Sequence, residues 1–166
     1  AVVLSAQSTD KGVNKATKQL FKLYDTPSKI LDLGLEGLIE HIKTIGLYNA
    51  KAKNIIALSK ILLEKYNGEV PDKMEALVEL PGVGRKTANV VLSCAFKQPT
   101  IPVDTHMIRV SNRLGFTTNK NPDKIEQDLM DLIPKKWLYN AHHWMVLHGR
   151  YVCKAKNPLC QDCIIN

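Results

Sequence analysis

The 166-residue sequence contains no apolar run that approaches the roughly 18 residues needed to span a membrane. It also lacks the charged, apolar and small-residue pattern of a secretion signal at its start. We therefore expect a cytoplasmic protein with no membrane partner. The apolar first residue, Ala1, and the abrupt end at Asn166 lead us to expect that the natural polypeptide continues on both sides.

Strict apolar–polar alternation, which marks an exposed strand, is also missing, and no repeat recurs at a fixed period. Apolar residues recur at helical spacing instead. The segment after a Thr9/Asp10 cap is typical, because one of its faces carries Val13, Ala16, Leu20, Leu23 and Tyr24. We expect an all-α fold of about eight helices, large enough for one compact domain or two small lobes.

Glycine, proline and cap residues predict where these helices begin and end. A helix over 35–44 should end at Gly46, where a left-handed residue costs little, and a long one should end at Asn67-Gly68. Short helices are expected over 72–80 and 84–96, on either side of a glycine turn. The last three helices should begin after Asp104, Asn121 and Pro134.

Lysine and arginine outnumber aspartate and glutamate by 23 to 16, which gives a formal net charge of +7. The basic residues occur throughout the chain, so they predict a cationic face that attracts polyanions such as nucleic acid. A positive charge that serves only solubility is an equally good explanation. The choice between solubility and nucleic-acid binding therefore depends on the motifs.

Residues 81–84, Pro-Gly-Val-Gly, separate the two short helices. Proline ends the first, and the two glycines allow a tight turn that presents bare N–H groups of Gly82, Val83 and Gly84 beside the next helix start. Such N–H groups and the helix dipole suit a phosphate oxygen. An ordinary tight turn would explain the glycines alone, but Arg85 and Lys86 add two cations at the same place.

Asp104 heads a later helix, about eighteen residues after Lys86. By itself it is a helix N-cap. A carboxylate near a half-buried lysine would instead form a catalytic pair, with an amine made nucleophilic by desolvation, by Arg85 and by the helix start.

Five blocks together resemble endonuclease III, the helix-hairpin-helix family of DNA glycosylases and abasic-site lyases. They are "SAQSTD", "IGLYNAKAKNI", "LPGVGRKTANVVL", "VDTHMIRVSNRLG" and "HHWMVLHGRYVC", in order along nearly the whole chain. The resemblance implies two helical lobes with a cleft. Residues 1–100 would form a mainly six-helix lobe that ends in the helix-hairpin-helix motif (about 72–96). Residues 101–166 would form the second lobe, with a cysteine loop (150–166), normally completed by missing N-terminal residues.

The cysteine tail has the spacing C-x6-C-x2-C at Cys153, Cys160 and Cys163. Clustered cysteines without a secretion signal favour a metal over disulfides, and zinc is the generic expectation. The resemblance implies instead a [4Fe–4S] cluster held by four thiolates, with the fourth expected at position 169. Cys94 is expected to be an inert core residue.

The resemblance also implies a monomeric, bacterial, nucleoid-associated enzyme that flips oxidised pyrimidines out of duplex DNA or cleaves at abasic sites. Lys86 would attack the sugar and form a Schiff base, Asp104 would stabilise the developing charge, and β-elimination would follow. Gln7 and Leu47 would fill the gap in the duplex. His106 would contact a phosphate or cap locally, and Lys154 would face the DNA backbone. His142, His143 and His148 are expected in packing and cluster-side hydrogen bonds.

Two other classes of protein would explain part of this pattern. A non-catalytic DNA-binding module uses the same hairpin to grip the backbone but needs neither a lysine at 86 nor a carboxylate at 104. A zinc-stabilised interaction domain would use the three cysteines but leaves the glycine turn unexplained.

Overall fold

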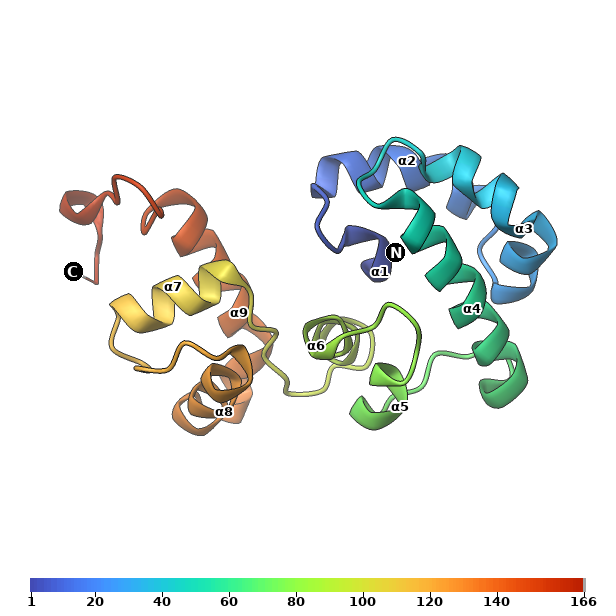
Figure 1. Cartoon of the computed structure of the whole chain (residues 1–166). Helices are drawn as coiled ribbons and strands as arrows, with labels where there is room; N and C mark the ends of the chain where they lie inside the picture. The colour runs from blue at the N-terminus through green and yellow to red at the C-terminus, as the bar shows by residue number, and fades with distance from the viewer. Residues whose placement is uncertain (166) are drawn as a thin grey trace. The chain divides into compact units, whose positions relative to one another are not determined.

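The computed structural model describes residues 1–165, except for the side chain of Asp10. These residues form α-helices and one 3₁₀ helix, and no strand occurs among them, which confirms the all-α prediction. The helices are α1 (Val2–Ser5), α2 (Asp10–Leu23), α3 (Pro27–Ile42), α4 (Tyr48–Tyr66), α5 (Met74–Val78), α6 (Arg85–Cys94), α7 (Thr105–Arg113), α8 (Pro122–Leu132) and α9 (Lys135–Tyr151), with η1 at Cys160–Asp162 (Figure 1). No helix within residues 1–165 is long and apolar enough to cross a membrane.

The chain divides into two compact units, Ala1–Ala88 and Asn89–Asn166. The division falls inside α6, whereas the sequence led us to expect lobes that meet at 100/101. The hairpin of α5, the glycine turn and the start of α6 thus belongs to the first unit, and the rest of α6 to the second.

The first unit is built around α3 and α4, which pack on each other, with α2 against α3 and α1 against both α2 and α4 (Figure 1). These helices enclose an apolar cluster, in which the most deeply buried members are Leu4, Leu20, Leu38, Ile42 and Ala52. The predicted apolar face of α2 is largely correct, although Leu23 at its end is exposed.

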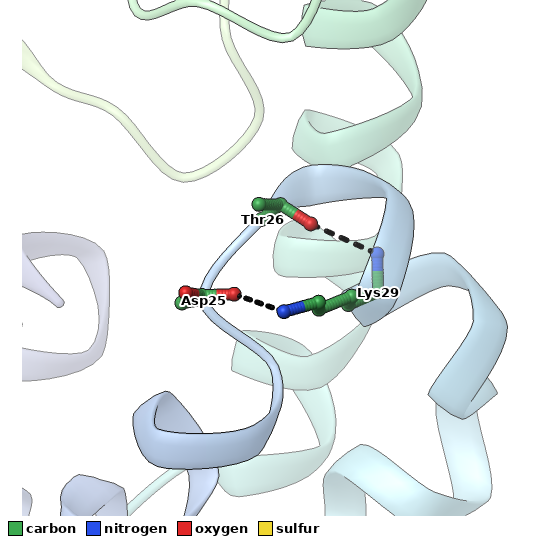
Figure 2. Close-up of polar contacts among 3 residues, drawn as sticks. All are labelled: Asp25, Thr26 and Lys29. Carbon is green, nitrogen blue, oxygen red and sulfur yellow. Dashed lines mark hydrogen bonds and ion pairs between the residues drawn. The ribbon is translucent and has the colours of Figure 1, made fainter.

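Helix α3 begins with a cap that the sequence analysis did not find. The Thr26 hydroxyl accepts a hydrogen bond from the backbone N–H of Lys29 at 3.3 Å, and Pro27 occupies the first turn. Figure 2 shows the Lys29 ammonium donating in the same turn to the Asp25 carboxylate, 2.8 Å away. The helix is kinked at Gly34, whose φ is 73°, so the expected 35–44 helix is the second half of a longer element.

The turn between α3 and α4 corrects one prediction. The left-handed residue there is Leu47, with φ 58°, and Gly46 has no positive φ. The prediction favoured glycine because a left-handed L residue costs about 1–2 kcal/mol. This turn lies against the Gln7–Ser8 loop, since a Cβ on Gly46 would lie 3.6 Å from the Gln7 carbonyl oxygen. The predicted left-handed end of α4 at Asn67-Gly68 is confirmed.

The second unit has its own core, in which α7 packs against α9 and α8 contacts α7. Gly149 of α9 allows this close approach, because a Cβ there would lie 2.9 Å from a methyl carbon of Val110 on α7. The predicted caps are confirmed: Asp104 accepts from the Met107 N–H at 2.8 Å, and Asn121 accepts from the N–H groups of Asp123 and Lys124.

Cys94 is exposed, which contradicts its expected place in the core. The buried face of α6 is made by Ala88, Asn89, Leu92 and Ser93. Cys94 follows Leu92 by two residues, or about 200° around a helix, so it points to solvent.

Candidate DNA-repair site

The glycine turn depends on one glycine for folding and leaves the other open. Gly82 has φ 77°, and a Cβ there would lie 2.9 Å from the Asn54 side-chain nitrogen and 3.1 Å from a methyl carbon of Val3. Gly84 has no positive φ, and a Cβ there would meet nothing within 4 Å. The turn therefore packs tightly on α4 and α1 at Gly82 and keeps its backbone accessible at Gly84.

Helix α6 begins directly after this turn. The Ala88 N–H donates to the Gly84 carbonyl at 2.9 Å, and the Val83 N–H donates to the Leu80 carbonyl at 3.0 Å. Arg85 and Lys86 thus lie in the first helical turn, where unpaired N–H groups and the positive end of the helix dipole favour an anion. The phosphate site that the sequence predicts at this turn stays a prediction.

The side chain of Lys86 is exposed, and not half-buried as the sequence analysis expected. Burial within the free protein therefore does not desolvate its amine. Lys86 belongs to the first unit and Asp104 to the second. Their predicted pairing stays a prediction, while the local setting of each residue is clear.

Asp104 is half-buried at the start of α7, and its Oδ1 accepts the Met107 N–H. The cap role that the residue type suggests is real, and Oδ2 takes no part in that bond. His106 lies two residues further along, and its Nδ1 accepts from Arg109 Nη2 at 3.1 Å. Because arginine only donates, this bond assigns the ring proton of a neutral His106 to Nε2.

The predicted gap-filling residues, Gln7 and Leu47, lie on two neighbouring loops of the first unit. A Cβ on Gly46, which precedes Leu47, would lie 3.6 Å from the Gln7 carbonyl oxygen. Both residues are exposed, and both have a left-handed backbone, with φ 51° and 58°. Two non-glycine residues held in a sparsely populated conformation indicate a constrained surface.

Cys153, Cys160 and Cys163 line one cavity of about 520 Å³ in the second unit, together with Arg113 and His148. Within residues 1–165 these side chains are not drawn together into a ready three-ligand site for a single ion. Arg113 Nη1 lies 3.4 Å from Cys153 Sγ, and His148 Nε2 lies 3.9 Å from Cys163 Sγ. A cationic donor beside a sulfur suits a thiolate, so the donor set fits a thiolate-bound group.

Arginine side chains also fix the backbone of the cysteine loop. Arg109 donates to the carbonyl oxygens of Cys153 and Gly149, and Arg113 donates to those of Lys154 and Ala155. The Lys154 side chain is exposed. These arginines were not among the predicted site residues, although their spacing of four residues on α7 placed them on one helical face.

Comparison with known proteins agrees with this arrangement. Residues 1–135 match the family model described as "HhH-GPD superfamily base excision DNA repair protein". The chain is 59% identical over 165 residues to endonuclease III of Rickettsia conorii, which covers 99% of this chain and 79% of that protein. It is 56% identical to endonuclease III of Escherichia coli, with 99% and 78% covered.

A solved structure of a trapped endonuclease III–DNA covalent intermediate, in an estranged-adenine complex, superposes with a TM-score of 0.93. It is 52% identical in sequence, and the match covers 99% of this chain and 78% of that one. The chain therefore belongs to the HhH-GPD superfamily of base excision DNA repair proteins and, within it, to the endonuclease III family.

Proposed function

We propose that this protein removes oxidised pyrimidines from duplex DNA and cuts the resulting abasic site, with Lys86 as nucleophile and Asp104 as its electrostatic partner. The enzyme class follows from the family, since endonuclease III is a DNA glycosylase and abasic-site lyase of base excision repair. The observation that carries the proposal is the exposed Lys86 amine in the first turn of α6, directly beside the accessible backbone of Gly84.

DNA binding is proposed to begin at the glycine turn. The N–H groups of Gly82 and Gly84 and the cation of Arg85 bind a backbone phosphate, because the turn presents them at a helix N-terminus. The Val83 N–H, which the sequence also suggested, already donates to the Leu80 carbonyl. His106 and Lys154 add contacts to the DNA backbone. A damaged base leaves the stack at a cost of a few kcal/mol, which is smaller than for an intact pair. Gln7 and Leu47 occupy the space left in the duplex.

The chemical step is proposed to use the Lys86 amine. The amine attacks C1′ of the deoxyribose, the glycosidic C–N bond breaks, and the base leaves after it gains a proton. Asp104 stabilises the positive charge that develops on the sugar and accepts the proton that the amine loses. The C1′–O4′ bond of the sugar then breaks as O4′ takes a proton, and the Schiff base that this leaves makes a C2′ proton acidic. Its removal breaks the C3′–O bond and cuts the strand 3′ to the lesion.

Endonuclease III proteins carry a [4Fe–4S] cluster, and we propose that Cys153, Cys160 and Cys163 hold it in this chain. The cluster would supply structural order to the loop and no electron to the reaction. Arg109 and Arg113 hold the loop backbone through three hydrogen bonds to its carbonyl oxygens, which keeps Lys154 on an exposed surface. The two arginine side chains thus help to order the cysteine loop and to place the Lys154 cation.

Borohydride trapping on duplex DNA that contains thymine glycol tests the proposal. The wild-type protein should form a covalent adduct, because borohydride reduces the Schiff base. Lys86→Gln should abolish trapping and strand cleavage, yet bind abasic DNA with nearly unchanged affinity. Lys60→Gln, a matched change at an exposed lysine of α4, should trap normally. Wild-type levels of adduct with Lys86→Gln would refute the assignment.

A further inference from the structure

Lys51 is an unusual lysine, because only 5% of its surface is exposed. It lies one turn into α4, and its Nζ donates to the Ser8 hydroxyl oxygen at 2.6 Å. Its backbone N–H donates to the Leu47 carbonyl at 3.0 Å. A single residue therefore bonds to both of the loops that carry Gln7 and Leu47.

Keeping an ammonium in this place has a cost. Burial lowers the pKa of the Lys51 amine, since desolvation disfavours its charged form. A methionine of similar length would fill the same space without that penalty. The buried ammonium thus has a task that an apolar chain would not perform, and the hydrogen bond to Ser8 is the task that the structure shows.

The bond joins two strained surface segments. Ser8 directly follows Gln7, and Lys51 follows Leu47 by one helical turn. The two loops also touch at Gly46, where a Cβ would lie 3.6 Å from the Gln7 carbonyl oxygen and 3.9 Å from the Ser8 hydroxyl. A left-handed conformation persists at non-glycine residues only when surrounding contacts hold it. The Lys51–Ser8 hydrogen bond and the approach of Gly46 to the Gln7–Ser8 loop are such contacts.

We propose that the Lys51–Ser8 hydrogen bond is a positioning clamp that holds Gln7 and Leu47 in register, so that both enter the duplex together when a damaged nucleotide leaves it. This inference rests on the proposed gap-filling roles of Gln7 and Leu47. The clamp acts through those residues and does not touch DNA, because only 5% of the Lys51 residue is exposed. Preorganisation of this kind raises the rate of the step after binding more than it raises affinity.

Ser8→Ala and Lys51→Met remove the two halves of the bond. A hydrogen bond to a charged group contributes enough that each variant should slow single-turnover release of thymine glycol about tenfold. Affinity for undamaged duplex should change less than about twofold. The double variant should be no slower than the slower single variant, because both substitutions remove the same hydrogen bond. Ser8→Thr, which keeps the hydroxyl, should restore most of the rate.

A second readout follows insertion directly. 2-Aminopurine placed beside a tetrahydrofuran abasic analogue brightens when its stacking is disturbed, and the clamp variants should reduce that change. Ser28→Ala on α3 and Lys60→Met on α4 are matched changes at exposed positions and should leave rate and fluorescence unchanged. If Lys51→Met does not fold, Ser8→Ala alone tests the clamp. That change removes only one oxygen atom from a half-buried loop residue, so the variant should still fold.

Three results would overturn the clamp. Ser8→Ala and Lys51→Met could retain wild-type rate and fluorescence while Gln7→Ala and Leu47→Ala lose both. The two single effects could add in the double variant. Lys51→Met could lower the slope of log affinity against log salt by about 0.9, which would make Lys51 a phosphate contact. If Gln7→Ala and Leu47→Ala keep the wild-type rate and fluorescence, the gap-filling roles of Gln7 and Leu47 are wrong. The clamp, which rests on those roles, is then wrong as well.

Discussion

Asp104 has a structural role and a proposed chemical one, and a single pair of substitutions separates them. Its Oδ1 accepts the Met107 N–H at 2.8 Å and caps α7. Asparagine keeps an acceptor oxygen in the same position and caps helices about as well as aspartate. Asp104→Asn therefore retains the cap and removes only the charge, whereas Asp104→Ala removes both.

The magnitudes of the two effects differ enough to be told apart. Loss of the cap in Asp104→Ala should cost about 1 kcal/mol, which lowers Tm by about 2–4 °C for a chain of this size. Loss of the charge beside the helix dipole in Asp104→Asn should cost less than about 1 kcal/mol. Loss of a positioned carboxylate from the reaction should slow base release by about two to four orders of magnitude, or about 2.7–5.4 kcal/mol of barrier.

The assay is single-turnover release of thymine glycol from duplex DNA, measured beside thermal unfolding. Asp104→Asn should lose activity at nearly unchanged Tm, and its affinity for DNA should hold or rise because a negative charge near phosphates is gone. Asn121→Ala is the matched control. It removes the cap of α8, which Asn121 forms with the N–H groups of Asp123 and Lys124, so it should lower Tm without slowing base release. If base release by Asp104→Asn stays within about threefold of wild type, Asp104 is only a helix cap.

Further predictions concern the glycine turn, an acidic residue and the cysteine loop. Gly82→Ala should destabilise the protein by about 2 kcal/mol or more, since it adds left-handed strain and close contacts, whereas Gly84→Ala should keep Tm and weaken DNA binding; equal Tm losses would contradict this difference. The Thr117 hydroxyl and then the Asn119 amide lower the pKa of Asp128, so its stabilising effect is present above about pH 4 and lost as pH falls through the lowered pKa. Acid titration of unfolding should show this loss in wild type and not in Asp128→Asn. Cys160→Ser should reduce bound iron and the absorbance near 400 nm relative to Cys94→Ser, which changes an exposed thiol outside the loop.

The sequence by itself determined the features that depend on neighbours within one helical turn. Thr9, Asp104 and Asn121 cap their helices because a side-chain oxygen reaches an N–H group two or three residues ahead. The glycine turn, and the two cations in the helical turn that follows it, also depend only on residues close together in the sequence. The cysteine spacing predicted a common site, and the three side chains do line one cavity.

Other features required contacts between residues far apart in the chain. The left-handed residue fell on Leu47 and not on Gly46, in a turn that lies against the Gln7–Ser8 loop some forty residues earlier. Lys51 lies on the buried side of α4, a position that its helical spacing from Tyr48 and Ile55 could have indicated. Its partner Ser8 could not be read from spacing at all.

Exposure was the property that sequence reasoning judged least well. Lys86 and Cys94 both lie on α6, and both are exposed where burial was expected. Helical periodicity predicts which residues share a face, but it does not say how wide the buried stripe is. That width depends on which other helices pack against the face, and on α6 the buried stripe is made of Ala88, Asn89, Leu92 and Ser93. Local hydrogen bonding thus settled the turns and caps, while packing between distant segments decided which side chains reach solvent.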